Sequence, residues 1–266
     1  MSTADLAKQA GMSEAQWKEA IKFDSTDRGW IIMSIGMAIG AGIVFLPVQV
    51  GLVGVWVFLL SALIAYPSIY LLQRLFINTL ADSPDCNDYP SIIGGYLGKN
   101  WGFFLGILYF MMSLICVFMY STALTNDSAS FLQSFGVTKG LLSDNPLYGL
   151  AVICFMVVVA SRGEQLLFKV STLMVLTKLC VVACLGLLMV QSWDLANLGA
   201  FPDWSYILKQ TIIMLPYTLT SIIFIPCLSP MVISYRSHHT SIHVARYKAM
   251  RAMKIAFFVL FITVFS

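Results

Sequence analysis

The sequence predicts an all-α membrane protein, and its composition and apolar pattern carry that prediction. The 266 residues are 59% hydrophobic and only 11% charged, whereas soluble domains carry about a quarter charged residues. Apolar runs of about 20 residues recur along the chain, which is the length a helix needs to cross a bilayer. The short alternating segments that are typical of a membrane β-barrel are not the dominant pattern. We therefore expect a set of helices in lipid.

Seven spans are expected after a polar N-terminal segment, 1–28, which has no signal-peptide core. Residues 29–266 then form one transmembrane domain. The fourth span is short and begins at Asn145-Pro146, a typical helix start. The stretch 86–100 is too broken to span and suits a short interfacial helix. The expected spans are 29–49, 52–75, 101–125, 146–161, 166–191, 207–235 and 253–266.

The positions of lysine and arginine orient these spans. With the N-terminus in the cytoplasm, only Lys139 and Lys209 fall outside and only Lys178 falls within a span, which satisfies the positive-inside rule. The final run, from Lys254, holds about 12 apolar residues, too few to cross a bilayer. We expect the seventh span to be incomplete and the sequence to be the front part of a longer protein.

The first span contains the run GMAIGAGIVFLP, at 36–47. Each glycine weakens a helix by roughly 1 kcal/mol relative to alanine. Gly36 and Gly40 alone suit close helix packing. Gly42 and Pro47 favour instead a helix that unwinds in mid-membrane, because Pro47 also lacks a backbone donor. Unwound backbone at that depth is tolerated where it lines a cavity, and its free N–H groups attract anions.

The sixth span, LPYTLTSIIFIPCLSP, contains a second break signal. Pro226 frees the carbonyl of Ile222, and Pro230 frees that of Pro226. Free carbonyls suit an ammonium group. Broken first and sixth spans at corresponding positions of two halves are typical of inverted-repeat transporters with a midplane site. Amides at one break and carbonyls at the other fit an amino acid zwitterion.

The run SIGMAIGAGIVFLPVQVG, with FDSTD upstream and LSPMVISYR downstream, resembles a known family. It is similar to the bacterial hydroxy/aromatic amino acid permeases of the amino acid–polyamine–organocation superfamily, and most to their serine-transporting branch. The resemblance covers nearly the whole chain from about Ala20. It implies a five-plus-five inverted repeat and proton-driven import of serine or threonine across the bacterial inner membrane. The eighth helix, which completes the superfamily's site, lies beyond this sequence.

The predicted substrate site consists of the two breaks. Thr220 and Ser221 are candidate partners for a substrate hydroxyl, but they equally suit bonds to their own helix backbone. The predicted substrate-binding residues are Ala38, Ile39, Gly40, Ala41, Gly42, Thr220, Ser221, Ile222, Ile223 and Phe224.

Lys178 is the one charge deep in a span, and such a residue is functional by default because lipid disfavours it. It is too far to snorkel, since about nine residues separate it from Lys169 at the cytoplasmic end. The resemblance implies a proton carrier, because some proton-coupled members place a fifth-helix lysine where sodium-coupled relatives hold a cation. We expect its ammonium near the carbonyls freed at Met37–Ile39.

Other chemistries have weaker signals. His238, His239 and His243 have a possible metal spacing, but their basic surroundings favour a loop that faces anionic lipid. The six cysteines form no disulfide framework, and no enzyme or phosphate-binding motif occurs. We expect no enzyme activity, no metal, no nucleic acid partner, and no cofactor besides the coupling proton. The alternatives are an aromatic amino acid or sodium-coupled transporter of the same fold, and a membrane receptor or assembly subunit whose breaks serve packing. Oligomeric state is not defined.

Overall fold

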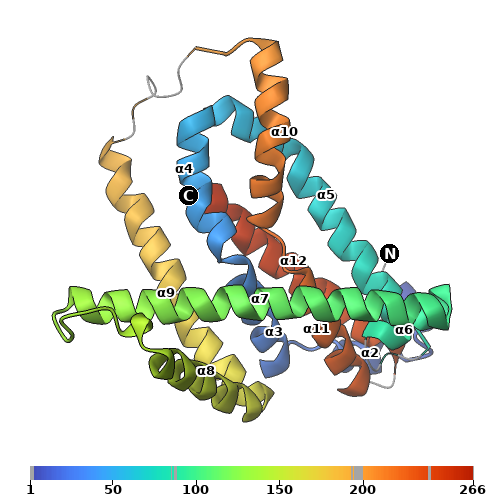
Figure 1. The fold of residues 1–266 in the computed structure, drawn as a ribbon. Helices are drawn as coiled ribbons and strands as arrows, with labels where there is room; N and C mark the ends of the chain where they lie inside the picture. Colours follow the sequence, from blue (N-terminus) through green and yellow to red (C-terminus); the bar gives the residue numbers. More distant parts are fainter. Residues whose placement is uncertain are drawn as a thin grey trace. The chain divides into compact units, whose positions relative to one another are not determined.

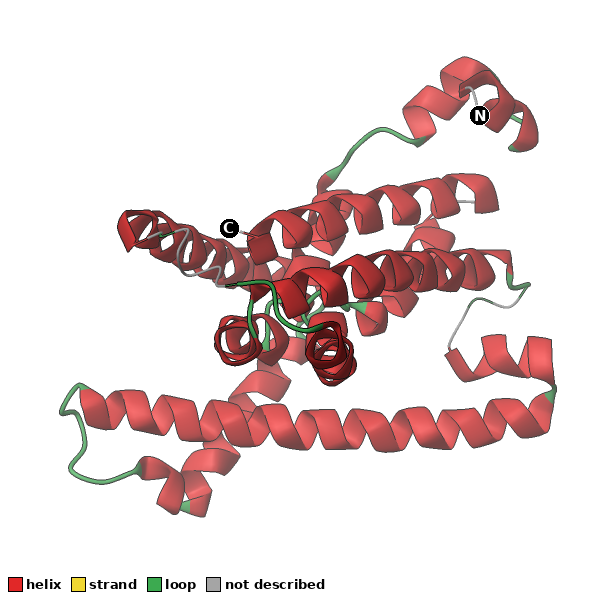
Figure 2. Ribbon diagram, turned by 90° about the horizontal axis from the view of Figure 1, so that it is seen from above, coloured by secondary structure: helices red, strands yellow, loops and turns green. Residues whose placement is uncertain are grey.

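Every regular element that the computed structural model describes is helical, which confirms the all-α prediction (Figure 2). The chain divides into two units, of which the first joins Met1–Cys86 to Phe168–Ser266 and the second is Asn87–Leu167. The described residues are 3–84, 86, 89–192, 194, 200–238 and 241–265.

Several helices are long and apolar enough to cross a membrane. Among the described residues there are 4 such stretches, and Pro146–Ser161 is a shorter apolar helix. The first expected span is absent from these because it is divided into two short helices. An all-α membrane protein is therefore what the structure describes, while the inverted repeat stays a prediction. The four stretches are Val55–Asp82, Lys99–Ser134, Phe168–Met189 and Trp204–His238.

The polar N-terminal segment is helical and folds into a hairpin. Helix α1 (Thr3–Gln9) and helix α2 (Glu14–Ala20) pack on each other. Ser13 caps α2 with a capping box, in which the Ser13 hydroxyl accepts from the Gln16 amide and the Gln16 side chain accepts from the Ser13 amide. We refer to α1 and α2 as the N-terminal hairpin.

The first span is interrupted by two residues. Helix α3 (Ser25–Ala38) begins earlier than expected, because Asp24 and Asp27 form a second capping box. Helix α4 (Ala41–Val53) then runs through Pro47 without ending there. Gly54, at φ +95°, turns the chain into α5 (Val55–Asp82), a conformation that glycine adopts without strain.

The sixth span is also interrupted. Helix α10 (Trp204–Thr220) and helix α11 (Ile225–His238) are separated by four non-helical residues, and Pro226 lies in the first turn of α11, where its missing N–H is tolerated. Helix α9 (Glu164–Met189), followed by the 3₁₀ turn η2 (Val190–Ser192), carries the fifth span.

The last helix, α12 (Ile242–Phe265), begins well before the expected seventh span at 253. Within the first unit α10 packs on α4 and α5, while α11 packs on α3, α5 and α12 (Figure 1).

The second unit contains α6 (Tyr89–Leu97), α7 (Lys99–Ser134), the 3₁₀ turn η1 (Leu142–Asp144) and α8 (Pro146–Ser161). Helix α6 agrees with the short helix expected within 86–100, and it packs on α7. The contact is close, since a Cβ on Gly102 would lie 2.8 Å from the Cα of Gly94. Helix α7 extends past the expected 125, and the Ser128 hydroxyl in this extension bonds carbonyls of its own helix.

Candidate functional site

The first break lies where the glycine run predicts it. The Ile39 amide still bonds the Ile35 carbonyl at 2.9 Å, but the Gly40 amide turns back to Ala38 at 2.8 Å. Gly40 then precedes α4 in an extended conformation, and it offers no side-chain cap. The first amides of α4 consequently lack both an intrahelical acceptor and a capping side chain. Such a helix N-terminus attracts a carboxylate.

Lys178, midway along α9, reaches this break. Its Nζ donates to the Ile39 carbonyl at 3.2 Å, although the rest of the side chain is exposed in the isolated chain. This is the neighbourhood expected from the sequence. An ammonium on a carbonyl that the helix has released satisfies a backbone group that lipid would leave unpaired.

The glycines of α3 serve packing against α9. A Cβ on Gly29 would lie 2.6 Å from the Phe168 ring, and a Cβ on Gly36 would lie 2.6 Å from Val175 Cγ2. Trp30 adds an edge-on contact with Phe168 at 5.4 Å between ring centroids. Each of the two interpretations of the glycine run therefore applies to a different glycine. Gly36 permits close packing, whereas Gly40 lies at the break.

The second break also lies where the prolines predict it. Ser221 ends α10, and the side chains of Ile222 and Phe224 are fully buried before α11 begins. The Ser221 hydroxyl donates to the Thr218 carbonyl at 2.7 Å and lies 3.4 Å from the hydroxyl of Tyr66 on α5. Tyr66 thus ties the end of α10 to a neighbouring helix.

The hydroxyl of Thr220 bonds its own helix. It lies 2.9 Å from the Pro216 carbonyl and 3.0 Å from the Tyr217 carbonyl. The hydroxyl protons of Thr220 and Ser221 are therefore bonded to backbone carbonyls of their own helix. This is one of the two alternatives that the sequence left open for these hydroxyls. Each hydroxyl oxygen still has lone pairs that accept a hydrogen bond.

The two breaks lie in the same region of the first unit. On one side of them α3 meets α11, where Ser34 Oγ contacts Cys227 Sγ at 3.6 Å. On the other side α4 packs on α10. The helices that flank the first break therefore contact the helices that flank the second. The surroundings of the side chains at 41 and 42 lie outside the described residues, so the exposure of the Ala41 and Gly42 amides to a cavity stays a prediction.

An apolar groove of 420 Å³ lies between α5 and α12. Tyr66 and Tyr70 line it from α5, and Phe257 and Phe261 line it from α12. Its lining is hydrocarbon and aromatic, which suits lipid or another helix better than a zwitterion.

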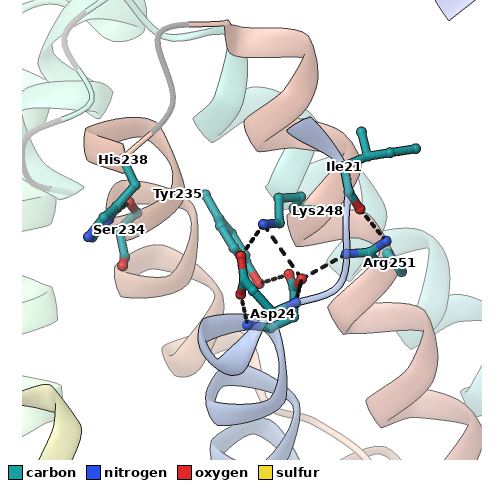
Figure 3. Close-up of polar contacts among 8 residues, drawn as sticks. Ile21, Asp24, Ser234, Tyr235, His238, Lys248 and Arg251 are labelled. Carbon is teal, nitrogen blue, oxygen red and sulfur yellow. Dashed lines mark hydrogen bonds and ion pairs between the residues drawn. The ribbon is translucent and has the colours of Figure 1, made fainter. Parts of the chain in front are cut away.

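A buried charge cluster, absent from the sequence prediction, joins α3, α11 and α12 at the N-terminal end of α3 (Figure 3). Asp27 is fully buried and accepts from the Tyr235 hydroxyl at 2.6 Å and from Arg251 Nη2 at 2.7 Å. Lys248, 1% exposed, donates to Asp24 at 2.5 Å and lies 3.6 Å from Asp27. Two carboxylates thus balance two cations.

Hydrogen bonding keeps Asp24 ionised. Burial raises the pKa of its carboxyl, but the bonds from Lys248 and from the Asp27 amide outweigh that effect and hold the pKa below its ordinary value. The sequence held one usable signal for this cluster, the capping-box pattern of Asp24 and Asp27.

The basic residues expected to face anionic lipid pair with the protein instead. Arg246 pairs with Asp82 at the end of α5, and Arg236 donates to the carbonyls of Ala81 at 2.8 Å and Ser83 at 3.3 Å. Together with Lys248 and Arg251, they hold the ends of α3 and α5. The expectation of a lipid-facing side chain is therefore wrong for Lys248, which is 1% exposed, and stays a prediction for the partly exposed Arg236, Arg246 and Arg251.

The histidines show no metal site in the part of the chain that the structure describes. No group of three or more potential ligands gathers there. The His238 ring bonds the Ser234 carbonyl of its own helix at 2.7 Å, and His239 lies outside the described residues.

Comparison with known proteins gives close relatives. No family model matches the chain, and no solved structure matches it significantly. A probable serine transporter of Escherichia coli K12 is 69% identical over 259 residues, which are 97% of this chain and 58% of that protein. A serine transporter of Escherichia coli O157:H7 matches to the same extent. A threonine/serine transporter of Yersinia enterocolitica is 25% identical over 174 residues, 64% of this chain and 38% of that protein.

The chain thus spans 58% of the length of the first two relatives. Their names are those of transporters rather than enzymes, in agreement with the sequence-based expectation. The comparison confirms the resemblance carried by the two helix-break motifs, which is to the bacterial transporters of the serine branch.

Proposed function

We propose that this chain forms the substrate-binding part of a secondary active transporter that imports serine by proton symport. The observation that carries the proposal is the pairing of two helix breaks within one unit, with the ammonium of Lys178 on the carbonyl of Ile39 at the first. Helix packing alone does not require two helix breaks within one unit. Unwound backbone in lipid, in contrast, needs a polar occupant or a polar partner.

Each end of the substrate has its own partner. The uncapped N-terminus of α4 offers amides to the carboxylate. The backbone at 221–224 offers carbonyls to the ammonium group, and Thr220 and Ser221 have acceptor lone pairs for the hydroxyl proton of serine. The name of the Yersinia relative favours threonine as a second substrate. Threonine keeps the same hydroxyl.

Lys178 carries the coupling proton. In its protonated form it bonds the Ile39 carbonyl and stabilises the end of α3. Loss of the proton turns the charged donor into a neutral amine, which weakens that bond and favours a rearrangement of α3. Protonation and the position of the first helix are thereby linked without a sodium ion.

The protein lies in the bacterial inner membrane with its N-terminus in the cytoplasm. This orientation puts the basic side chains of α11 and α12 on the cytoplasmic side, in accordance with the positive-inside rule.

Uptake of radiolabelled serine into proteoliposomes tests the function. We expect accumulation that follows an imposed inward proton gradient in sodium-free buffer, and competition by threonine but not by aromatic amino acids. A sodium requirement would assign the coupling to sodium, and competition by tryptophan or tyrosine would assign an aromatic substrate. Absence of both uptake and counterflow would overturn transport and favour the receptor alternative.

A further inference from the structure

The N-terminal hairpin is seated on α12 by one tryptophan. Trp17 is fully buried although α2 is a short helix at the start of the chain, and it clusters with Ala7 and with Val244 of α12. Its ring contacts that of Tyr247 edge-on, at 5.7 Å between centroids. The indole Nε1 has no hydrogen-bond partner among the described residues, so Trp17 itself holds the hairpin by apolar contact.

Arg251 joins this seat to the buried charge cluster. One arm of its guanidinium donates to the Ile21 carbonyl at 2.6 Å, directly after the hairpin, and the other donates to Asp27 at 2.7 Å. The guanidinium also lies over the rings of Phe23 and Tyr247, at 5.2 and 5.8 Å. Ile21 and Phe23 directly follow the hairpin, and Tyr247 lies on the helix that seats it. Arg251 therefore bridges the chain directly after the hairpin and Asp27 with one guanidinium.

Asp27 in turn holds α3 along α11. At one end of the pair Tyr235 donates to Asp27, and at the other Ser34 contacts Cys227. Asp27 and Ser34 lie on one face of α3, two turns apart, and α11 runs antiparallel to it. Cys227 is 3% exposed, and Ser34 of α3 contacts its thiol. Loss of the charged end of this contact is therefore expected to loosen α3 over the thiol at the other end.

We propose that the N-terminal hairpin is an intramolecular clasp: while docked on α12 it keeps Arg251 on Asp27 and so holds the start of α3 against α12, next to α11, and its release frees α3. A clasp of this kind sets how often the end of α3 opens. Its existence does not depend on the proposed transport, because the contacts involve no substrate.

Cys227 is a native reporter for the clasp. All six cysteines are free thiols, so a background with Ala at 86, 116, 154, 180 and 184 leaves Cys227 as the only thiol. The test is its rate of reaction with a small maleimide in the protein purified from membranes and reconstituted in nanodiscs. We expect Trp17→Ala to raise that rate about tenfold, as local opening becomes more frequent. Asp27→Asn should raise it at least as much.

Release of the hairpin is measured separately, by the rate of tryptic cleavage after Lys22. Glu19→Gln is the matched control, because it breaks only the exposed pair of Glu19 with Lys22, at 3.7 Å. It should leave Cys227 labelling unchanged. Arg251→Lys keeps the charge but removes the two-armed contact, and should give an intermediate rate.

Two results would overturn the clasp. In the first, Trp17→Ala speeds tryptic cleavage, yet Cys227 reacts at the parental rate, which separates the hairpin from α3. In the second, Trp17→Ala does not speed cleavage, which shows that the tryptophan does not seat the hairpin. A protein that shows the expected labelling but no serine uptake would keep the clasp and refute the transport proposal, so the two fail independently.

Discussion

The two helix breaks of the first unit differ in what fills them. The first is two residues long, is bordered by Gly40, and has a released carbonyl that a charged side chain occupies. The second is four residues long, precedes Pro226, and is filled by the buried side chains of Ile222 and Phe224. Side chains are buried at both breaks, since Ile39 is 4% exposed, but a charged side chain bonds the backbone at the first. Under the proposed coupling, the first is the break that a change of protonation would alter.

The largest expected effect is at the first break. Gly42→Val should abolish serine binding, because a branched side chain next to the α4 amides blocks the approach of a carboxylate. Membrane insertion should persist, since valine suits a membrane helix. Binding of radiolabelled serine to the purified protein measures the first effect and yield in the membrane fraction the second. An unchanged affinity would remove the α4 amides from the site.

Next in size is the charge that distinguishes the first break. Lys178→Ala should abolish serine accumulation driven by a proton gradient, and Lys178→Arg should do the same, because arginine keeps its proton. Counterflow in the absence of a gradient tests whether substrate exchange remains. Lys169→Ala, an exposed lysine on the same helix, is the control and should accumulate serine normally. Normal accumulation by Lys178→Ala would make the lysine structural.

A moderate effect separates packing from unwinding within the glycine run. Gly36→Ala places a Cβ 2.6 Å from Val175 Cγ2 and should destabilise the protein by about 1–3 kcal/mol, as overpacking does. Gly51→Ala is the control, because nothing lies within 4 Å of its added Cβ. Thermal unfolding in detergent gives the comparison. Val175→Ala should restore stability to Gly36→Ala, and failure to do so would contradict the packing role.

The smallest expected effect is at the second break. Thr220→Val should weaken the binding of serine by roughly 1 kcal/mol more than the binding of alanine, because only serine has a hydroxyl that loses its partner. Thr218→Val makes the same change at a buried hydroxyl that bonds the Met214 carbonyl, and should affect both substrates equally. Competition of each amino acid against labelled serine measures the difference. Equal losses in Thr220→Val would assign Thr220 to structure alone.

The breaks could be located from the sequence because glycine and proline act on the backbone within one turn. Gly40 and Pro226 each lie within two residues of an observed helix end. The charge cluster could not be predicted in this way. Asp27 and Arg251 are 224 positions apart, and neither carries a local signal of its partner. The capping-box pattern in the sequence indicates the early start of α3. The expected span begins at 29 because apolarity alone places it there.

The long separation of Asp27 from Arg251 has a consequence for the order of synthesis. At ribosomal rates of about 5–20 residues per second, Arg251 emerges roughly ten to forty-five seconds after Asp27. During that interval the carboxylate has no cation from α12 to pair with. It must then remain hydrated at the membrane surface, since an unpaired carboxylate is strongly disfavoured in a dry interior. The charge cluster at the start of α3 is consequently completed only when α12 has been made.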